Sequence, residues 1–242
     1  GPHPHHPDIE DPVLALQAPI DHEGPAGQHD GALRLAAGVL QRDERLDRVE
    51  DRLRRHHRDE GAPQRLAAAA KQAVGNIDIL INSAGGSQPA IPIDAPESDW
   101  VHGMTLNFVR VRQLTHAVLP QMIEGKWGRV INISGKSEPE ALIAATPTKA
   151  AIHAWSKGLS REVGPHGVTV DCIPPGRIMS EQIRRKYSPE FRAEQSRTEI
   201  PVGRYGEPEE LAVLAVFLSS PLAGYITGTV MPVDGGLRKY AF

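Results

Sequence analysis

Residues 77–86 read Ile-Asp-Ile-Leu-Ile-Asn-Ser-Ala-Gly-Gly, a short apolar run that ends in a turn of small and polar residues. Such a run is typical of a strand that is buried on both faces of a parallel sheet. The pattern recurs along the chain at residues 129–133, 168–173 and 225–233. Helical patterns separate these runs at residues 65–74, 100–124, 147–163 and 207–219.

The alternation of strand and helix predicts the α/β class, with a doubly wound parallel sheet and helices on both faces. Ligands of such sheets bind beyond the carboxyl ends of the strands. The polar or Gly-rich turns at 82–86, 134–137 and 174–180 all follow strands. We therefore expect these three turns to line one crevice.

The first 60 residues differ in composition from the rest of the chain. They contain no Lys, Ser, Thr, Asn, Met, Cys, Phe, Tyr or Trp. With few β-branched and no aromatic residues, this segment offers almost no material for a strand. Residues 1–30 read as an irregular lead-in, and a charged amphipathic helix is predicted within 32–58. The expected organisation is an atypical lead segment at 1–60 and one α/β domain at 61–242.

Composition excludes several classes of protein. A balance of 27 Lys+Arg against 30 Asp+Glu gives a net charge of -3, which argues against binding nucleic acid through a basic face. A single Cys excludes an internal disulfide framework and a cysteine-rich zinc site. No apolar run long enough for a membrane span and no signal-peptide pattern is found. The expectation is a cytoplasmic protein with no membrane or nucleic-acid partner.

A His-Pro-His-His run at residues 3–6 could bind a metal ion. No partner ligands follow it at a fixed spacing, so a solvated tail is the preferred interpretation and no metal site is predicted.

Several short motifs occur at a joint spacing that resembles one known family. The turn Asn82-Ser83-Ala84-Gly85 is similar to an Asn-Asn-Ala-Gly turn, and Asn107 follows Gly85 by 22 residues. Lys149-Ala-Ala is followed 26 residues later by Pro175-Gly176. Residues 201–211 and 225–236 fit the same pattern. On these motifs, residues from about 62 to 242 resemble the short-chain dehydrogenase/reductase family, and most of all its 3-oxoacyl-carrier-protein reductases.

This resemblance implies a Rossmann-like fold and an oxidoreductase that moves a hydride between NAD(H) or NADP(H) and a carbonyl or alcohol carbon of a small-molecule substrate. It implies that Lys149 holds the nicotinamide ribose and that Asn107 anchors a water that relays protons. It also implies a homo-oligomer, a dimer or a tetramer. The cofactor-binding positions that it implies are Asn82, Ala84, Gly85, Lys149, Pro175, Gly176 and Ser180.

The acid/base part of the family pattern is altered. The family has Tyr-x-x-x-Lys, but the residue four positions before Lys149 is Ala145. His153 has the same spacing to Lys157, one helical turn further on, but a histidine on the helix surface is the simpler interpretation. The usual serine position carries Gly135, which Ser134 and Ser137 flank. Either serine could take the catalytic role, or both could only satisfy backbone groups in the loop.

The phosphate-binding part cannot be found either. The family's Thr-Gly-x-x-x-Gly-x-Gly turn, whose bare backbone approaches a pyrophosphate, is absent from residues 1–60. The N-terminal half of the fold is therefore atypical or degenerate. One hypothesis is that this segment is translated from a shifted reading frame, and the rival is a natural divergent N-terminus with a helix over the sheet edge. Two functions stay open: an active oxidoreductase, or a catalytically impaired family member that serves as a scaffold or oligomer subunit.

Overall fold

The computed structural model describes residues 14–16, 61–86, 93–136 and 141–239. In this part of the chain a sheet has the strand order β1-β2-β3-β4. The strands are β1 (Leu14–Leu16), β2 (Ile79–Asn82), β3 (Gly128–Ile133) and β4 (Val168–Ile173). β2, β3 and β4 are parallel, and Ile81 of β2 is opposite Ile131 of β3. The three buried strands lie where the sequence predicts them, with β2 shifted by one or two residues.

β1 contradicts two expectations. It is a strand inside the lead segment, and it pairs antiparallel with β2, so that Leu14 is opposite Ile81. The sequence predicts almost no strand material before residue 60 and a wholly parallel sheet. The prediction fails because β-propensity describes side-chain packing, whereas a sheet edge can pair with the backbone of any extended segment.

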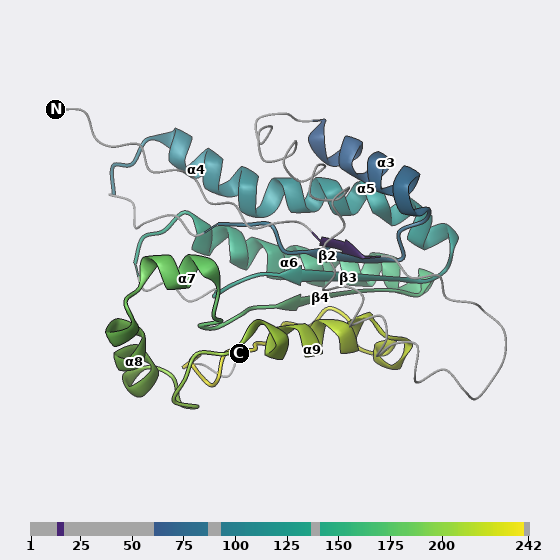
Figure 1. Cartoon of the computed structure of the whole chain (residues 1–242). Helices are drawn as coiled ribbons and strands as arrows, with labels where there is room; N and C mark the ends of the chain where they lie inside the picture. The colour runs from purple at the N-terminus through teal and green to yellow at the C-terminus, as the bar shows by residue number, and fades with distance from the viewer. Residues whose placement is uncertain (1–13, 17–60, 87–92, 137–140, 240–242) are drawn as a thin grey trace.

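Helices cover both faces of the sheet (Figure 1). On one face lie α3 (Ala62–Val74), α5 (Arg110–Glu124) and α6 (Ala145–Val163), and on the other lies α9 (Pro208–Ser219). Successive strand residues point to opposite faces. Leu80 and Val130 therefore pack with the helices of the first face, and Ile131 packs against α9. This arrangement is the predicted doubly wound α/β fold.

The predicted helix at 100–124 begins three residues earlier and is interrupted. It consists of α4 (Glu97–Met104), the π-helical stretch η1 (Thr105–Val109) and α5. π-turns inside helices are rare and frequently occur at functional sites. Asn107 lies in this stretch.

The C-terminal part differs from the prediction in one element. The strand expected at 225–233 is present only as isolated parallel bridges to the β4 region, which pair Cys172 with Val230 and Pro175 with Val233. Before it, the stretch at 178–191 contains α7 (Glu181–Lys186) and the start of α8 (Pro189–Thr198). The short 3-10 helices η2 (Gly164–His166) and η3 (Pro221–Ala223) complete the described elements.

Buried polar side chains form a hydrogen-bond network that runs across neighbouring strands, between α5 and α6. Asn82 Nδ2 donates to Thr115 Oγ1 at 3.0 Å and to Asn132 Oδ1 at 2.8 Å. Asn132 Nδ2 donates in turn to Ser156 Oγ at 2.9 Å, and the Cys172 thiol donates to the same oxygen at 3.2 Å. Leaving such a buried group unpaired costs about 1–3 kcal/mol. The network therefore fixes α6 against the carboxyl ends of the strands.

Candidate active site

Lys149 brings together two turns at the carboxyl ends of the strands. It lies in the second turn of α6, after Pro147, whose missing N–H is tolerated in a first helical turn. The stem of its side chain passes Gly135, where an added Cβ would lie 3.3 Å from Lys149 Cγ. At Gly85 an added Cβ would lie 2.8 Å from Lys149 Nζ. The ammonium thus ends beside the backbone of the 82–86 turn.

Asn107 meets the same turn from the π-helical stretch. Its Nδ2 donates to the carbonyl of Gly103 at 3.0 Å, and its Oδ1 accepts from the backbone N–H of Gly86 at 3.0 Å. A Cβ on Gly85 would lie 2.9 Å from this Oδ1. Asn107 is almost completely buried. It therefore holds the turn in place and shares Gly85 as a neighbour with Lys149.

The third turn adjoins the second. Lys136, in the 134–137 turn, lines a small pocket with Pro174, Pro175, Gly176, Asp234 and Arg238. A Cβ on Gly176 would lie 2.5 Å from Asp234 Cα, so the two backbones touch. The three turns that were expected to line one crevice therefore lie together, joined through Lys149 and through this pocket.

Ser134 and His153 form a hydrogen-bonded pair that the sequence did not indicate. Ser134 follows β3, and its Oγ lies 2.8 Å from His153 Nε2. The interpretation of His153 as a surface residue is wrong, because the ring is half-buried against this hydroxyl. Burial lowers the pKa of His153 to about 4, and the positive charges of Arg238 and Lys149 act in the same direction. The imidazole is therefore neutral at pH 7.

The i, i+4 spacing of Lys149 and His153 places both on one helix face and is the sequence signal that could have drawn attention to His153. Ser134 could not have been identified as its partner, because the contact depends on how the loop after β3 meets α6. Ser134 does not serve only to satisfy the loop backbone, since its hydroxyl binds a side chain.

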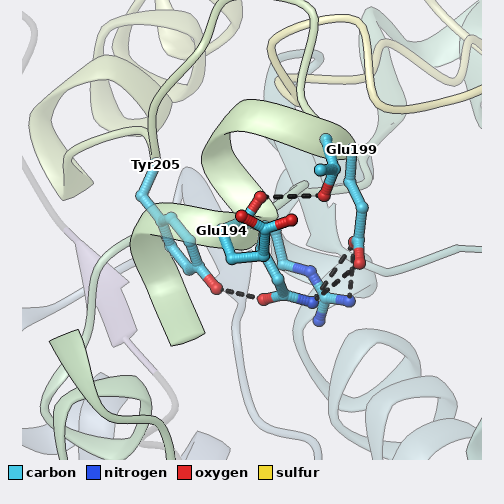
Figure 2. Close-up of polar contacts among 6 residues, drawn as sticks. Glu194, Glu199 and Tyr205 are labelled. Atoms are coloured by element: carbon cyan, nitrogen blue, oxygen red, sulfur yellow. Dashed lines mark hydrogen bonds and ion pairs between the residues drawn. The ribbon is translucent and has the colours of Figure 1, made fainter. Parts of the chain in front are cut away.

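No described tyrosine replaces the missing one at Ala145, which is buried at the start of α6. Tyr225 is fully exposed, and Tyr187 stacks on Phe191 with 5.0 Å between ring centroids. The Tyr205 hydroxyl donates to a side chain of α8 (Figure 2). Burial raises the pKa of Tyr205, which makes its phenol a poorer acid.

The hydrogen bond of Tyr205 belongs to a network that anchors α8. Gln195 accepts from Tyr205 and donates to Glu199 at 3.2 Å, and Glu199 forms an ion pair with Arg177 at 3.6 Å (Figure 2). Arg177 directly follows Gly176. The α7–α8 segment is thereby tied to the 174–180 turn, one of the three turns that the sequence predicts to line the ligand crevice.

The remaining predicted positions have mixed placements. The Asn82 side chain is buried and hydrogen-bonded to Thr115 and Asn132, so only the Asn82 backbone is available to a ligand. Ser180 Oγ accepts from the N–H of Ile183 at 3.2 Å and caps α7. Ala84 belongs to the turn beside Lys149. Ser137, the His run at 3–6 and any equivalent of the Gly-rich turn within 17–60 lie outside the described residues.

Other reactive side chains near the site are held inert. Burial raises the pKa of the Cys172 thiol to about 11, so this cysteine stays protonated. Within the described residues no group of three or more His, Cys, Asp or Glu side chains could hold a metal ion. The helices of the same ranges include none that is both long and apolar enough to cross a bilayer.

Known proteins match most of the chain. The family described as Enoyl-(Acyl carrier protein) reductase matches residues 44–238. The 3-oxoacyl-[acyl-carrier-protein] reductase FabG of Aquifex aeolicus is 34% identical over 174 residues, which are 68% of this chain and 66% of the relative. The rhamnolipids biosynthesis 3-oxoacyl-[acyl-carrier-protein] reductase of Pseudomonas aeruginosa is 35% identical over 187 residues, which are 74% of this chain and 73% of the relative.

Solved structures give the same result. YwfH, described as an NADPH dependent reductase involved in bacilysin biosynthesis, is 28% identical with a TM-score of 0.74, over 86% of this chain and 92% of that one. RhlG of Pseudomonas aeruginosa in its NADP complex is 32% identical with a TM-score of 0.69, over 86% and 81%. The predicted Rossmann-like fold and the oxidoreductase class are confirmed. The chain belongs to the short-chain dehydrogenase/reductase family.

Proposed function

We propose that this chain is an active NAD(P)-dependent oxidoreductase that interconverts a carbonyl and an alcohol, with Lys149 and Asn107 at its centre. One observation carries the proposal: Lys149 Nζ and Asn107 Oδ1 both lie against the backbone of Gly85, at the carboxyl end of β2. This is the edge of an α/β sheet at which ligands bind.

The described residues fit the nicotinamide end of a dinucleotide. Gly85 and Gly176 are two positions where neighbouring protein atoms occupy the place of a side chain, so that only glycine lets Lys149, Asn107 and Asp234 approach the backbone this closely. The Lys149 ammonium, with three donors, suits the hydroxyls of a ribose. Ala84, Pro175 and Gly176 would border the nicotinamide through their backbones, and Ser180 would border it at the start of α7. When bound, NAD(P)H supplies the hydride.

The protein's side chains then orient the substrate and handle its proton. Ser134 is the described serine next to the position that the family uses, and its hydroxyl would contact the substrate oxygen. Lys149 places a positive charge near the same point, which stabilises negative charge developing on that oxygen. Ser137 is the other candidate for this contact. Asn107 keeps the 85–86 turn in register with Lys149.

The relatives direct the choice of substrate and cofactor. Both curated relatives are named as 3-oxoacyl-[acyl-carrier-protein] reductases, and both structural neighbours are named with NADPH or NADP. We therefore take 3-oxoacyl thioesters and NADPH as the first pair to test, with NADH and simple ketones for comparison. Cytoplasmic location and assembly into a dimer or tetramer belong to the same proposal.

Dinucleotide titration tests the proposal directly. NADPH or NADH should quench the fluorescence of the tryptophans with a Kd below millimolar. Lys149→Ala should raise this Kd at least tenfold and abolish most turnover, because the ribose loses its cationic donor. Lys157→Ala, two turns further along α6, is the matched control and should change neither quantity by more than twofold. Absence of binding at millimolar dinucleotide would instead favour the alternative of a catalytically impaired family member that serves as a scaffold.

A further inference from the structure

The family's proton donor is missing from this chain, yet reduction of a carbonyl requires a proton as well as a hydride. Ala145 has no ionisable group, and the Tyr205 hydroxyl is engaged by Gln195. Ser134 and His153 are the described polar pair that lies one helical turn from Lys149 and is not part of the sheet network. This makes the pair the place to look for a substitute.

We propose that Ser134 and His153 form a proton relay that replaces the tyrosine, with Ser134 in contact with the substrate oxygen and His153 acting through Ser134. The inference deepens the proposed function and rests on it. Its geometric basis is the 2.8 Å contact between Ser134 Oγ and His153 Nε2. Among the described residues, none forms a hydrogen bond to the second ring nitrogen, Nδ1. A ring with one nitrogen on a hydroxyl and the other unbonded can pass a proton from one side to the other.

The relay balances in both directions. During reduction, the carbonyl is reduced at the expense of NAD(P)H, and negative charge forms on the substrate oxygen. The Ser134 O–H bond breaks as its proton moves to that oxygen, the Nε2 proton of His153 moves to Ser134 Oγ, and Nδ1 takes a proton from water. During oxidation every step reverses, and the proton leaves to water from Nδ1. The ring ends each reaction in its other neutral tautomer.

The surroundings of His153 keep the ring in the neutral form that a relay needs. A neutral imidazole is both a donor and an acceptor, whereas an imidazolium only donates. The charged groups facing the ring are Lys149, from the preceding turn of α6, and Arg238, from the segment after the Asp234 turn. Burial, followed by these two positive charges, lowers the pKa of His153 to about 4. The relay is therefore complete at neutral pH and is lost as the pH falls below about 4.

Two variants of His153 separate proton transfer from structure. His153→Ala should bind NADPH as the parent does but lose about 100-fold or more in kcat, the usual contribution of a positioned acid or base. Added imidazole should restore part of this loss, since it can occupy the vacated space and exchange protons. His153→Gln keeps a donor and an acceptor for Ser134 but has no exchangeable tautomer. It should fold, bind NADPH, turn over slowly and show no acid limb in its pH profile.

Ser134→Ala and a matched histidine complete the set. Ser134→Ala should lose as much turnover as His153→Ala, and the double variant should lose no more, because the two residues act in series. His116→Ala removes an exposed histidine of α5 and should leave turnover and binding unchanged. Independently of activity, ¹⁵N NMR of the imidazole should give a pKa far below 6.5 for His153 in the parent chain, and Ser134→Ala should shift the Nε2 resonance.

Several results would overturn the relay. These are a kcat of His153→Ala within twofold of the parent, a loss that imidazole does not recover, or a His153 pKa near 6.5 by NMR. Loss of turnover in Tyr187→Phe with full activity in His153→Ala would also overturn it by assigning the proton to a phenol. A chain that binds NADPH but reduces neither 3-oxoacyl thioesters nor simple ketones has no relay, although it keeps the proposed cofactor site. A chain that does not bind dinucleotide refutes the proposed function itself.

Discussion

Gly85 is the point at which the 82–86 turn, Lys149 and Asn107 come closest. A methyl group added here would lie 2.8 Å from Lys149 Nζ and 2.9 Å from Asn107 Oδ1. Both polar side chains, or the turn itself, must then shift, since real Cβ atoms do not approach that closely. We expect Gly85→Ala to raise the Kd for NADPH by about tenfold, the effect of losing roughly one ionic hydrogen bond. Fluorescence titration measures the change.

Gly158 provides the control for this substitution. It lies on α6, and a Cβ there would meet nothing within 4 Å. Gly158→Ala should leave the Kd unchanged and raise the free energy of unfolding by about 0.5–1 kcal/mol, because alanine favours a helix interior over glycine. Equal NADPH affinity in Gly85→Ala and the parent would remove Gly85 from the cofactor site.

Among single residues, the sequence predicts those that belong to short motifs with a fixed spacing. Gly85, Asn107 and Lys149 were selected from their positions in short patterns, and the structure brings them together. The sequence misplaces His153, because its hydrogen-bond partner lies in a loop that is close in space but distant along the chain. A hydrogen bond between residues 134 and 153 has no signature in composition or periodicity.

The N-terminus of α9 shows how one helix end depends on ionisation. Pro208 begins the helix, and the Glu207 N–H donates to Glu210 Oε2 at 2.8 Å as part of a capping box. Arg204 also donates to this carboxylate, with both contacts at 2.7 Å. The Arg204 hydrogen bonds, followed by the Glu207 N–H, lower the pKa of Glu210 from 4.5 to about 2.

We therefore expect Glu210 to make the free energy of unfolding depend on pH in the acid range. Its folded pKa is below its unfolded value, so its contribution is fully present above pH 4.5 and is lost as the pH falls toward 2. Glu210→Gln should lower the Tm by a few degrees at pH 7, and the difference from the parent should vanish near pH 2. Thermal unfolding followed by circular dichroism at several pH values measures this. Glu209→Gln changes a charge on the same turn without these contacts and should show no such pH-dependent gap.

Among the elements, long periodic segments were predicted well and edges were not. The buried strands and the helices α3, α5, α6 and α9 follow from apolar periodicity, Pro and Gly signals. The π-stretch in the 97–124 helix was missed because i→i+5 hydrogen bonding has no sequence period of its own. β1 was missed because pairing at an open sheet edge is decided by backbone groups, which every residue carries.

For the whole molecule, apolar side chains on α9 face away from the sheet. Val213 is 70% exposed and Phe217 is 42% exposed, although the inner face of the same helix packs on Ile131. Leu222 and Tyr225, which follow in the chain, are exposed as well. α9 covers the face of the sheet opposite to the face that α5 covers (Figure 1). Exposed apolar patches commonly mark an interface between proteins, and Val213 and Phe217, one turn apart on α9, are the candidates for such a surface.

If the chain assembles as a dimer or tetramer through this surface, charge placed on it should dissociate the assembly. Val213→Glu combined with Phe217→Glu removes two apolar side chains, each contributing about 1.5–3 kcal/mol when buried, and adds two charges that must be desolvated. We expect the double variant to weaken self-association by at least about 100-fold, equivalent to roughly 3 kcal/mol. Light scattering coupled to size-exclusion chromatography over a concentration series should then show a smaller species. Ala68→Glu adds one such charge at an exposed position of α3 and should leave the mass of the assembly as in the parent. An identical mass for the double variant and the parent would place the interface elsewhere, and a monomeric parent would end the prediction of an oligomer.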